Sequence, residues 1–359
     1  MNVLFLDHCE SDYGSAFLFN GLCRVIGPEN IYDFPLKYSY HGIDHRYSTS
    51  AIENGFTSPL PWMPAWSFAW SEEERQTGDG LALLEGTRKR LREGFFDLVV
   101  MGSMREIAMS SFFRLEPEIR RAGIPIVVHE GEDFQQICKD HLAAIRPTLH
   151  LKREVPKSNA PSCDWRVIPF PFSFPDNPTA DALYGHLDAI AAVPKSDVIF
   201  MCGGTWDARF DMLRVLDEAG DLNAVLGTDG TSQEKIPNRK RVGDLAGWWE
   251  YLQRVSEARI GVSVRGFGYD TCRFWETAYC TLLAHDRPDL QMEHPYTAGV
   301  NCMEFNDPGD FLRQARSLLA QDRAAEYDAM KTACLLHTRK YHTNSARARQ
   351  MLAAIGMGV

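Results

Sequence analysis

The stretch RGFGYDTCRFWETAYCTLLAHDRP, residues 265–288, indicates an α/β fold. It follows an apolar run at 258–264, opens with two glycines, continues as a helix-like segment at 272–280 and ends in a second apolar run at 281–284. Apolar runs joined by a helix are typical of parallel strands covered on both faces. Ligands of such sheets bind beyond the carboxyl ends of the strands, where helix N-termini offer amides to phosphate. The stretch therefore predicts a site for a ligand with phosphates and hydroxyls.

The same alternation runs through the rest of the chain. The pattern predicts strands at 3–6, 97–101, 124–129, 197–202 and 224–226, and helices at 15–25, 77–93, 113–122, 210–219, 245–254, 310–320, 324–341 and 345–355. The aromatic and proline-rich residues 35–75 predict an ordered loop without regular elements, and the charged, proline-rich residues 149–178 predict an irregular linker. Two consecutive βα arrays predict two Rossmann-like domains facing across a cleft, at 1–180 and 181–340, with 341–359 as a helix returning toward the first domain.

Composition limits the classes of function. A length of 359 residues suits two α/β domains, and a net charge of −10 gives no general attraction for polyanions. The basic runs at 88–92 and 239–241 are short and predict solvated surfaces. The first residues lack the pattern of a signal peptide, and no apolar stretch is long enough to span a membrane. Nine cysteines without CxxC spacing indicate reduced thiols, so we expect a cytoplasmic protein.

The run at 265–284 resembles group 1 glycosyltransferases of the GT-B fold, and within them the CgeB-like branch. The shared features are a glycine-rich loop, an aromatic residue, Thr271, Arg273, an aromatic residue, Glu276, an alanine and a small apolar strand. The resemblance implies transfer of a hexosyl or pentosyl group from a UDP- or GDP-linked sugar to a hydroxyl acceptor. The acceptor stays open between a glycan, a protein, a small molecule and a nucleobase. The nucleotide-sugar is a substrate, so no cofactor is expected.

Two segments supply the expected donor-binding residues. In the resemblance Glu276 binds the ribose hydroxyls, because a carboxylate accepts two hydrogen bonds from a diol. Arginines, loop side chains and amides at strand-to-helix turns would hold the diphosphate. The expected donor set is Gly203, Gly204, Thr205, Arg209, Arg265, Tyr269, Asp270, Thr271, Arg273 and Glu276.

The sequence after the strand at 124–129 predicts the catalytic residues. His129, Glu132 and Asp133 follow an apolar run, at the sheet edge where an acceptor hydroxyl would be activated. An inverting enzyme needs such a base, whereas a retaining one does not. The resemblance favours retention, but Gly268 stands where many retaining members have a second glutamate, so the anomeric outcome stays open.

The chain has no Asp-x-Asp, HExxH, P-loop or GxSxG pattern, which favours transfer without a metal. Two other functions remain possible from the sequence. One is a nucleotide-sugar-binding protein without transferase activity, and the other is a GT-B epimerase of a UDP-sugar. Release of nucleoside diphosphate in the presence of an acceptor separates the transferase from the binding protein, and isomerisation without an acceptor identifies the epimerase.

Overall fold

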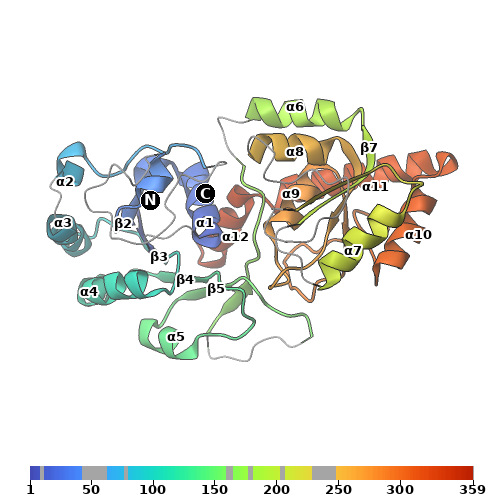
Figure 1. Ribbon diagram of the computed structural model, residues 1–359. Coiled ribbons are helices and arrows are strands. Elements are labelled where there is room, and N and C mark those ends of the chain that lie inside the picture. Colours follow the sequence, from blue (N-terminus) through green and yellow to red (C-terminus); the bar gives the residue numbers. More distant parts are fainter. Residues whose placement is uncertain are drawn as a thin grey trace. The chain divides into compact units, whose positions relative to one another are not determined.

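Two separate parallel sheets form the framework of the protein (Figure 1). The computed structural model describes residues 1–8, 12–42, 63–76, 80–158, 165–176, 181–202, 207–228 and 248–358. The Cα positions divide the chain into two compact units: unit 1 contains 1–171, 175–179 and 344–359, and unit 2 contains 172–174 and 180–343. The last helix therefore belongs to unit 1, which also contains the first strand.

Unit 1 holds a six-stranded sheet of order β2-β1-β3-β4-β5-β6. Its strands are β1 (Val3–Leu6), β2 (Ile31–Phe34), β3 (Leu98–Met101), β4 (Ile126–Glu130), β5 (Leu149–Lys152) and β6 (Val167–Pro169). Its helices are α1 (Tyr13–Ile26), α2 (Glu72–Gln76), α3 (Gly80–Arg92), α4 (Glu106–Ala122), α5 (Lys139–Ile145) and α12 (Asn344–Ala354), with short 3-10 turns at Pro28–Asn30 and Tyr38–His41. Every pairing in this sheet is parallel, so all carboxyl ends share one edge.

Unit 2 holds a five-stranded parallel sheet of order β11-β10-β9-β7-β8. Its strands are β7 (Ser196–Cys202), β8 (Ala224–Thr228), β9 (Ala258–Ser263), β10 (Leu282–His285) and β11 (Met303–Glu304). Its helices are α6 (Asp181–Ala191), α7 (Asp207–Glu218), α8 (Trp248–Ser256), α9 (Cys272–Cys280), α10 (Pro308–Leu318) and α11 (Ala324–Tyr341), with a 3-10 turn at Gln321–Arg323. Helices α7 and α10 contact each other, and α8, α9, α6 and α11 form a second contacting group.

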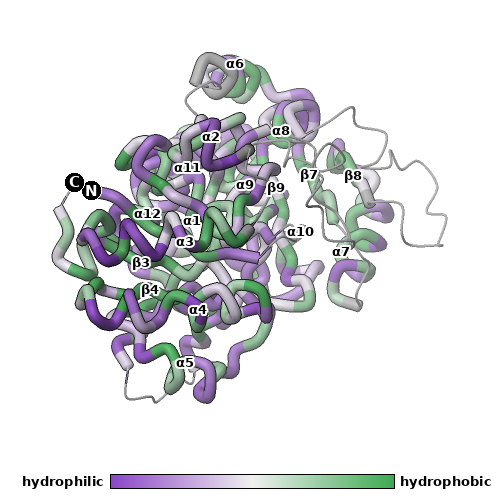
Figure 2. The backbone as a smooth tube through the Cα atoms, turned by 90° about the vertical axis from the view of Figure 1, so that its left-hand side faces the viewer, coloured by the Kyte–Doolittle hydropathy of each residue, from purple (hydrophilic) through white to green (hydrophobic). Residues whose placement is uncertain are grey.

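Helix α4 shows how the pattern of side chains builds these layers. It buries Met109, Phe112, Leu115 and Ile119, which recur at intervals of three or four residues and so share one face. In Figure 2 the helices change between purple and green along their length, as expected of helices that cover a sheet. Helix α4 begins at Glu106, seven residues before its predicted start, and it continues through Pro117.

Two segments differ from the expectation of irregular structure. The predicted linker at 149–178 contains β5 and β6, so the prediction of irregular structure there is wrong. Strand β5 can end in the charged Lys152 because a carboxylate compensates the buried ammonium. Its Nζ lies 3.2 Å from the carboxylate of Glu130 at the end of β4. The predicted loop at 35–75 contains the turn at Tyr38–His41 and helix α2, while its residues 43–62 lie outside the described part. Within the described residues, no helix is both long enough and apolar enough to cross a membrane.

Candidate functional site

The quoted stretch forms the carboxyl edge of β9 and the helix α9 that follows it. Thr271 is the N-cap of α9, and its backbone has the extended conformation usual at that position. Gly261 in β9 allows the helix to lie close, because a Cβ there would come within 2.3 Å of the Thr277 methyl group. Helix α9 thus begins after the loop that follows β9, and its N-terminus suits an anionic ligand.

Glu276 lies on α9 between two aromatic groups of α8. The indole Nε1 of Trp248 donates to Glu276 Oε1 at 2.9 Å, and the hydroxyl of Tyr251 also forms a hydrogen bond with this carboxylate. Burial raises the pKa of Glu276, although Trp248, the charge of Arg273 and Tyr251 each act in the opposite direction. Burial, followed by the charge of Glu276, raises the pKa of Tyr251 well above its usual value. The neighbours thus orient the carboxylate, while burial makes its ionisation less favourable than in water.

Arg209 is held at the same edge by the main chain. This buried side chain of α7 donates from Nε to the carbonyl oxygens of Val264 at 3.3 Å and Arg265 at 3.0 Å. A Cβ on residue 266 would lie only 2.8 Å from Nη2 of Arg209, so glycine at this position leaves space for the guanidinium. Asp286, which follows β10, accepts the amide of Arg265 at 3.1 Å, and burial raises the pKa of its carboxyl. The first glycine of the loop thus makes room for a guanidinium beyond β9.

The other predicted donor residues occupy different positions around this loop. Arg265 is exposed and its Nη1 donates to the hydroxyl of Tyr269 at 3.2 Å. Asp270 is buried, and its carboxylate accepts the amide of Phe172 at 2.6 Å and the indole N–H of Trp275 at 2.8 Å. This geometry gives Asp270 a role in fixing the loop. Gly203, Gly204 and Thr205 lie outside the described residues.

His129 has the geometry of a base among the three predicted catalytic residues. It lies buried in β4 at the carboxyl edge of unit 1, where Nδ1 donates to the carbonyl oxygen of Gly102 at 3.1 Å, which leaves Nε2 as the basic nitrogen. Burial lowers the pKa of His129, so the neutral imidazole dominates at neutral pH. Gly14 and Gly131 leave space for its ring, since a Cβ at either would approach Cε1 within 3 Å.

Glu132 and Asp133 both form ion pairs with arginines. Glu132 Oε1 lies 3.1 Å from Nε of Arg105, and Asp133 is paired with Arg153. The carboxylates of both residues are thus engaged with arginines. The structure therefore distinguishes His129 from the two acids predicted with it.

A buried polar network beside β1 could not be predicted in full from the sequence. Asp7 accepts from Tyr40 Oη at 2.5 Å and from Lys37 Nζ at 2.9 Å through Oδ2, while His8 Nδ1 lies 2.9 Å from Oδ1. Burial acts to raise the pKa of Asp7, but Lys37 and His8 together bring it well below its usual value. Asp7 and His8 directly follow the predicted strand at 3–6, whereas Lys37 and Tyr40 come from the segment predicted to be a loop.

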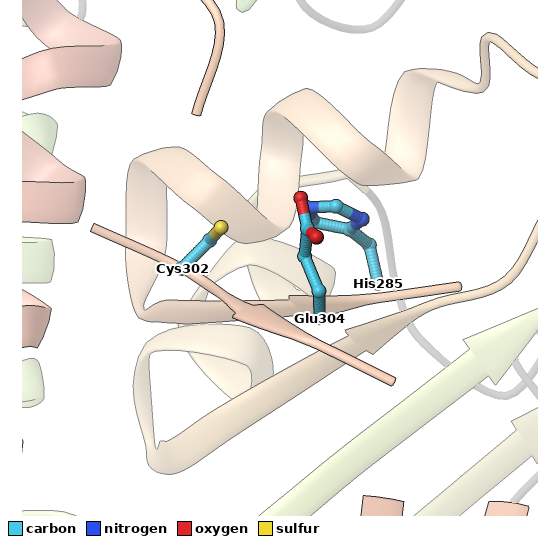
Figure 3. A group of neighbouring side chains, drawn as sticks. All are labelled: His285, Cys302 and Glu304. Carbon is cyan, nitrogen blue, oxygen red and sulfur yellow. The ribbon is translucent and has the colours of Figure 1, made fainter. Parts of the chain in front are cut away.

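Side chains that could hold a metal ion gather elsewhere in the described residues. His285, Cys302 and Glu304 lie together at the end of β10 and in and before β11 (Figure 3). None of them is a predicted donor or catalytic residue. Residues beside Glu276 and Arg273 supply hydrogen bonds and charge without forming such a cluster in the described part.

The comparisons agree with the predicted fold. Residues 209–353 match the family described as glycosyl transferase-like, and no curated protein matches the chain. The structure is similar to HepE of Anabaena in complex with UDP-glucose, with 11% identity over 99% of each chain and a TM-score of 0.56. A glycosyltransferase from Rickettsia africae has 10% identity over 99% of this chain and 97% of its own, with a TM-score of 0.58. A sucrose-phosphate synthase from Thermosynechococcus elongatus has 11% identity over 99% and 98%, with a TM-score of 0.55.

At these identities the structural likeness establishes the fold. The two parallel sheets and this match confirm the predicted α/β fold of GT-B type, and residues 209–353 are similar to the glycosyl transferase-like family. The matched family segment begins at Arg209 and includes Arg273 and Glu276. The narrower resemblance to the CgeB-like branch stays a prediction.

Proposed function

We propose that this protein transfers a glycosyl group from a UDP- or GDP-linked sugar to a hydroxyl acceptor. The observation that carries the proposal is the oriented carboxylate of Glu276 on α9, next to an edge that also holds Arg209. The glycosyl transferase-like family segment spans both residues, and the GT-B fold supports the same reading. HepE, one of the similar structures, was crystallised with UDP-glucose, which makes a nucleotide-sugar a reasonable donor here.

Glu276 would bind the ribose of the donor. Trp248 and Tyr251 fix the carboxylate from one side, and it stays only partly buried, so a vicinal diol can donate to it. Its raised pKa gives the contact a pH dependence of predictable sign. Because the ionised form accepts both hydroxyl protons, nucleotide affinity should fall as the pH is lowered and Glu276 becomes protonated.

Arg209 and Arg273 would hold the diphosphate as it leaves, together with amides at the start of α9. Positive charge fixed in advance stabilises a developing anion more in a dry site than in water. Arg209 meets this requirement because two carbonyl oxygens fix its Nε. The proposed transfer therefore needs no divalent metal at the diphosphate.

His129 would serve as the base on unit 1 if the reaction inverts the anomeric centre. Its Nε2 would take the proton of the acceptor hydroxyl as the oxygen bonds to the anomeric carbon and the bond to the diphosphate breaks. The lowered pKa of His129 keeps the imidazole neutral and able to accept that proton. A retaining reaction would proceed without this step, so the stereochemistry of the product tests the role of His129.

Calorimetric titration of UDP and GDP into the protein tests the donor site. Glu276→Gln should weaken binding of the preferred nucleotide by roughly 1–3 kcal/mol, the range for losing a charge-assisted hydrogen bond. Glu218→Gln on α7 is the matched control, because that glutamate is exposed and forms an ion pair with Arg214 on the same helix. Equal affinity of both variants for each nucleotide would reject the assignment of Glu276. Release of nucleoside diphosphate with a panel of acceptors then tests transfer itself.

A further inference from the structure

Three side chains with metal-binding atoms converge at the edge of the unit 2 sheet. His285 and Glu304 are register partners on the parallel strands β10 and β11, and Cys302 precedes Glu304 by two residues. Residues two apart on an extended segment point to the same face. Figure 3 shows the imidazole, the carboxylate and the thiol rising from the same side of these strands. The ligand atoms of all three residues lie within 4.8 Å of one another.

The spacing of these atoms suits a bridging ion better than a direct contact. His285 Nε2 and Glu304 Oε1 are 3.8 Å apart, which is too long for a hydrogen bond. This distance is just under twice the zinc–nitrogen or zinc–oxygen bond length of about 2.0–2.2 Å. An ion between the two atoms would therefore bond to both with little movement. Arg287 Nε lies 3.5 Å from the other carboxylate oxygen and holds the carboxylate in this orientation.

A cavity lies beside two of the three residues, Cys302 and Glu304. It has a volume of about 380 Å³, and its walls include Cys302 and Glu304 together with Asp310, Gln314 and Glu326. Cys302 is fully buried and His285 is 4% exposed, so two of the three ligands are shielded from bulk water. Three protein ligands leave the fourth position of a tetrahedral ion for a water molecule.

We propose that His285, Cys302 and Glu304 bind a divalent ion of the zinc class. The mixture of thiolate, imidazole and carboxylate selects Zn²⁺ or Co²⁺ over Mg²⁺ and Ca²⁺, which prefer oxygen ligands. Binding would release the thiol proton of Cys302 to solvent. It would also move the proton of neutral His285 from Nε2 to Nδ1, because Nδ1 now accepts the amide of Arg287 at 3.2 Å. That amide bond would be given up.

Such an ion would join the edge strand β11 to β10. The two strands share only a short ladder, with Ala284 opposite Met303 and His285 opposite Glu304. A metal bond across the second pair would fix the edge of the sheet. This proposal does not rest on the proposed glycosyl transfer, since it concerns binding of a metal alone.

Titration of Co²⁺ into chelator-treated protein tests the site. A cysteine ligand gives a thiolate-to-cobalt absorption band, which we expect to saturate at one equivalent and to disappear on addition of Zn²⁺ but not of Mg²⁺. Cys302→Ser should abolish the band, and Glu304→Gln should weaken Co²⁺ binding about tenfold or more. Cys138→Ser is the matched control, since this cysteine is exposed and outside the cluster.

Circular dichroism of both variants separates loss of the site from loss of the fold. If Cys302→Ser does not fold, the partly exposed Glu304 still gives a variant whose Co²⁺ affinity decides the question. Absence of a saturable band in the unaltered protein would overturn the proposal. So would a band of unchanged affinity in Glu304→Gln, or one that Cys138→Ser removes.

Discussion

Each sheet has a buried carboxylate near its carboxyl edge, and the pKa values of the two are shifted in opposite directions. In unit 1, Asp7 lies between Lys37, His8 and Tyr40. Burial acts to raise the pKa of Asp7, but Lys37 and His8 outweigh it and bring the pKa well below its usual value. In unit 2, Glu276 meets two neutral aromatic donors and the charge of Arg273, but burial outweighs them and raises its pKa. A carboxylate whose pKa the protein lowers contributes to stability, whereas a carboxylate whose pKa burial raises is a candidate for binding a ligand. The comparison assigns a largely structural role to the first group and a binding role to the second.

Asp7→Asn should have the largest effect on stability. The change leaves the ammonium of Lys37 buried and without its carboxylate, and breaking a buried pair in this way costs about 3–5 kcal/mol. Urea denaturation followed by fluorescence measures the loss. The double variant Asp7→Asn, Lys37→Met should recover much of it, while Glu93→Gln on the surface should have little effect. A loss below about 1 kcal/mol for Asp7→Asn would remove the contrast between the two edges.

The pH dependence of stability sharpens the same contrast. Because the pKa of Asp7 is lower in the folded protein than the ordinary 3.8, its contribution is fully present above about pH 5 and is lost as the pH falls toward the folded value. His8, Lys37 and Tyr40 face this carboxylate. Thermal unfolding between about pH 6 and pH 3 should show a decline that the Asp7→Asn, Lys37→Met variant reduces. An equal decline in both proteins would contradict the prediction.

Gly266→Ala tests whether Arg209 binds a ligand. The new Cβ would lie 2.8 Å from Nη2, so the guanidinium must move while the backbone can stay in place. Affinity for the nucleoside diphosphate should fall about tenfold, which corresponds to about 1.4 kcal/mol. Gly220→Ala is the control, because a Cβ at that position meets no atom within 4 Å. Unchanged diphosphate affinity in Gly266→Ala would exclude Arg209 from the binding site.

Trp248→Phe should give the smallest effect. It removes the hydrogen bond to Glu276 while keeping an aromatic ring, so nucleotide affinity should fall by about 1 kcal/mol. Since that bond favours the ionised form, its loss raises the pKa of Glu276 further, and the difference from the unaltered protein should grow as the pH is lowered. Titrations at about pH 8 and pH 6 measure this trend, with Trp249→Phe as the neighbouring control. A difference that shrinks at lower pH would reverse the proposed role of Trp248.

The regular parts of the fold could be predicted because their signal is local. Helix α9 has its predicted bounds, and β1 and α11 also coincide with their predictions. β5 was missed because its last residue, Lys152, is charged, and the carboxylate that compensates it belongs to Glu130, 22 positions earlier. Pairings of that range are set by the order of strands in the sheet, which a charge pattern does not reveal.

The residues of the candidate site could likewise be predicted where their signal is local, but their distant partners could not. Arg209, Arg273 and Glu276 could be named because each lies in the first turns of the helix that follows a strand, where α/β sheets bind phosphates. The partners that decide what Glu276 can do were not foreseen, since Trp248 lies 28 positions away on another helix. The cluster of His285, Cys302 and Glu304 was missed for a related reason. Its members are up to 19 positions apart and form no short motif, and only the pairing of β10 with β11 brings them together.

The chain returns to unit 1 at its last helix, and this has a consequence for how the protein is made. Helix α12 packs on α1, where Gly21 allows close approach because a Cβ there would lie 2.2 Å from the carbonyl oxygen of Asn344. Domains usually complete their folding in the order of synthesis. Here the ribosome must finish all of unit 2 before it releases the helix that covers α1. During translation unit 2 can therefore complete its core first. The apolar surface of α1 is covered only after α12 has been synthesised.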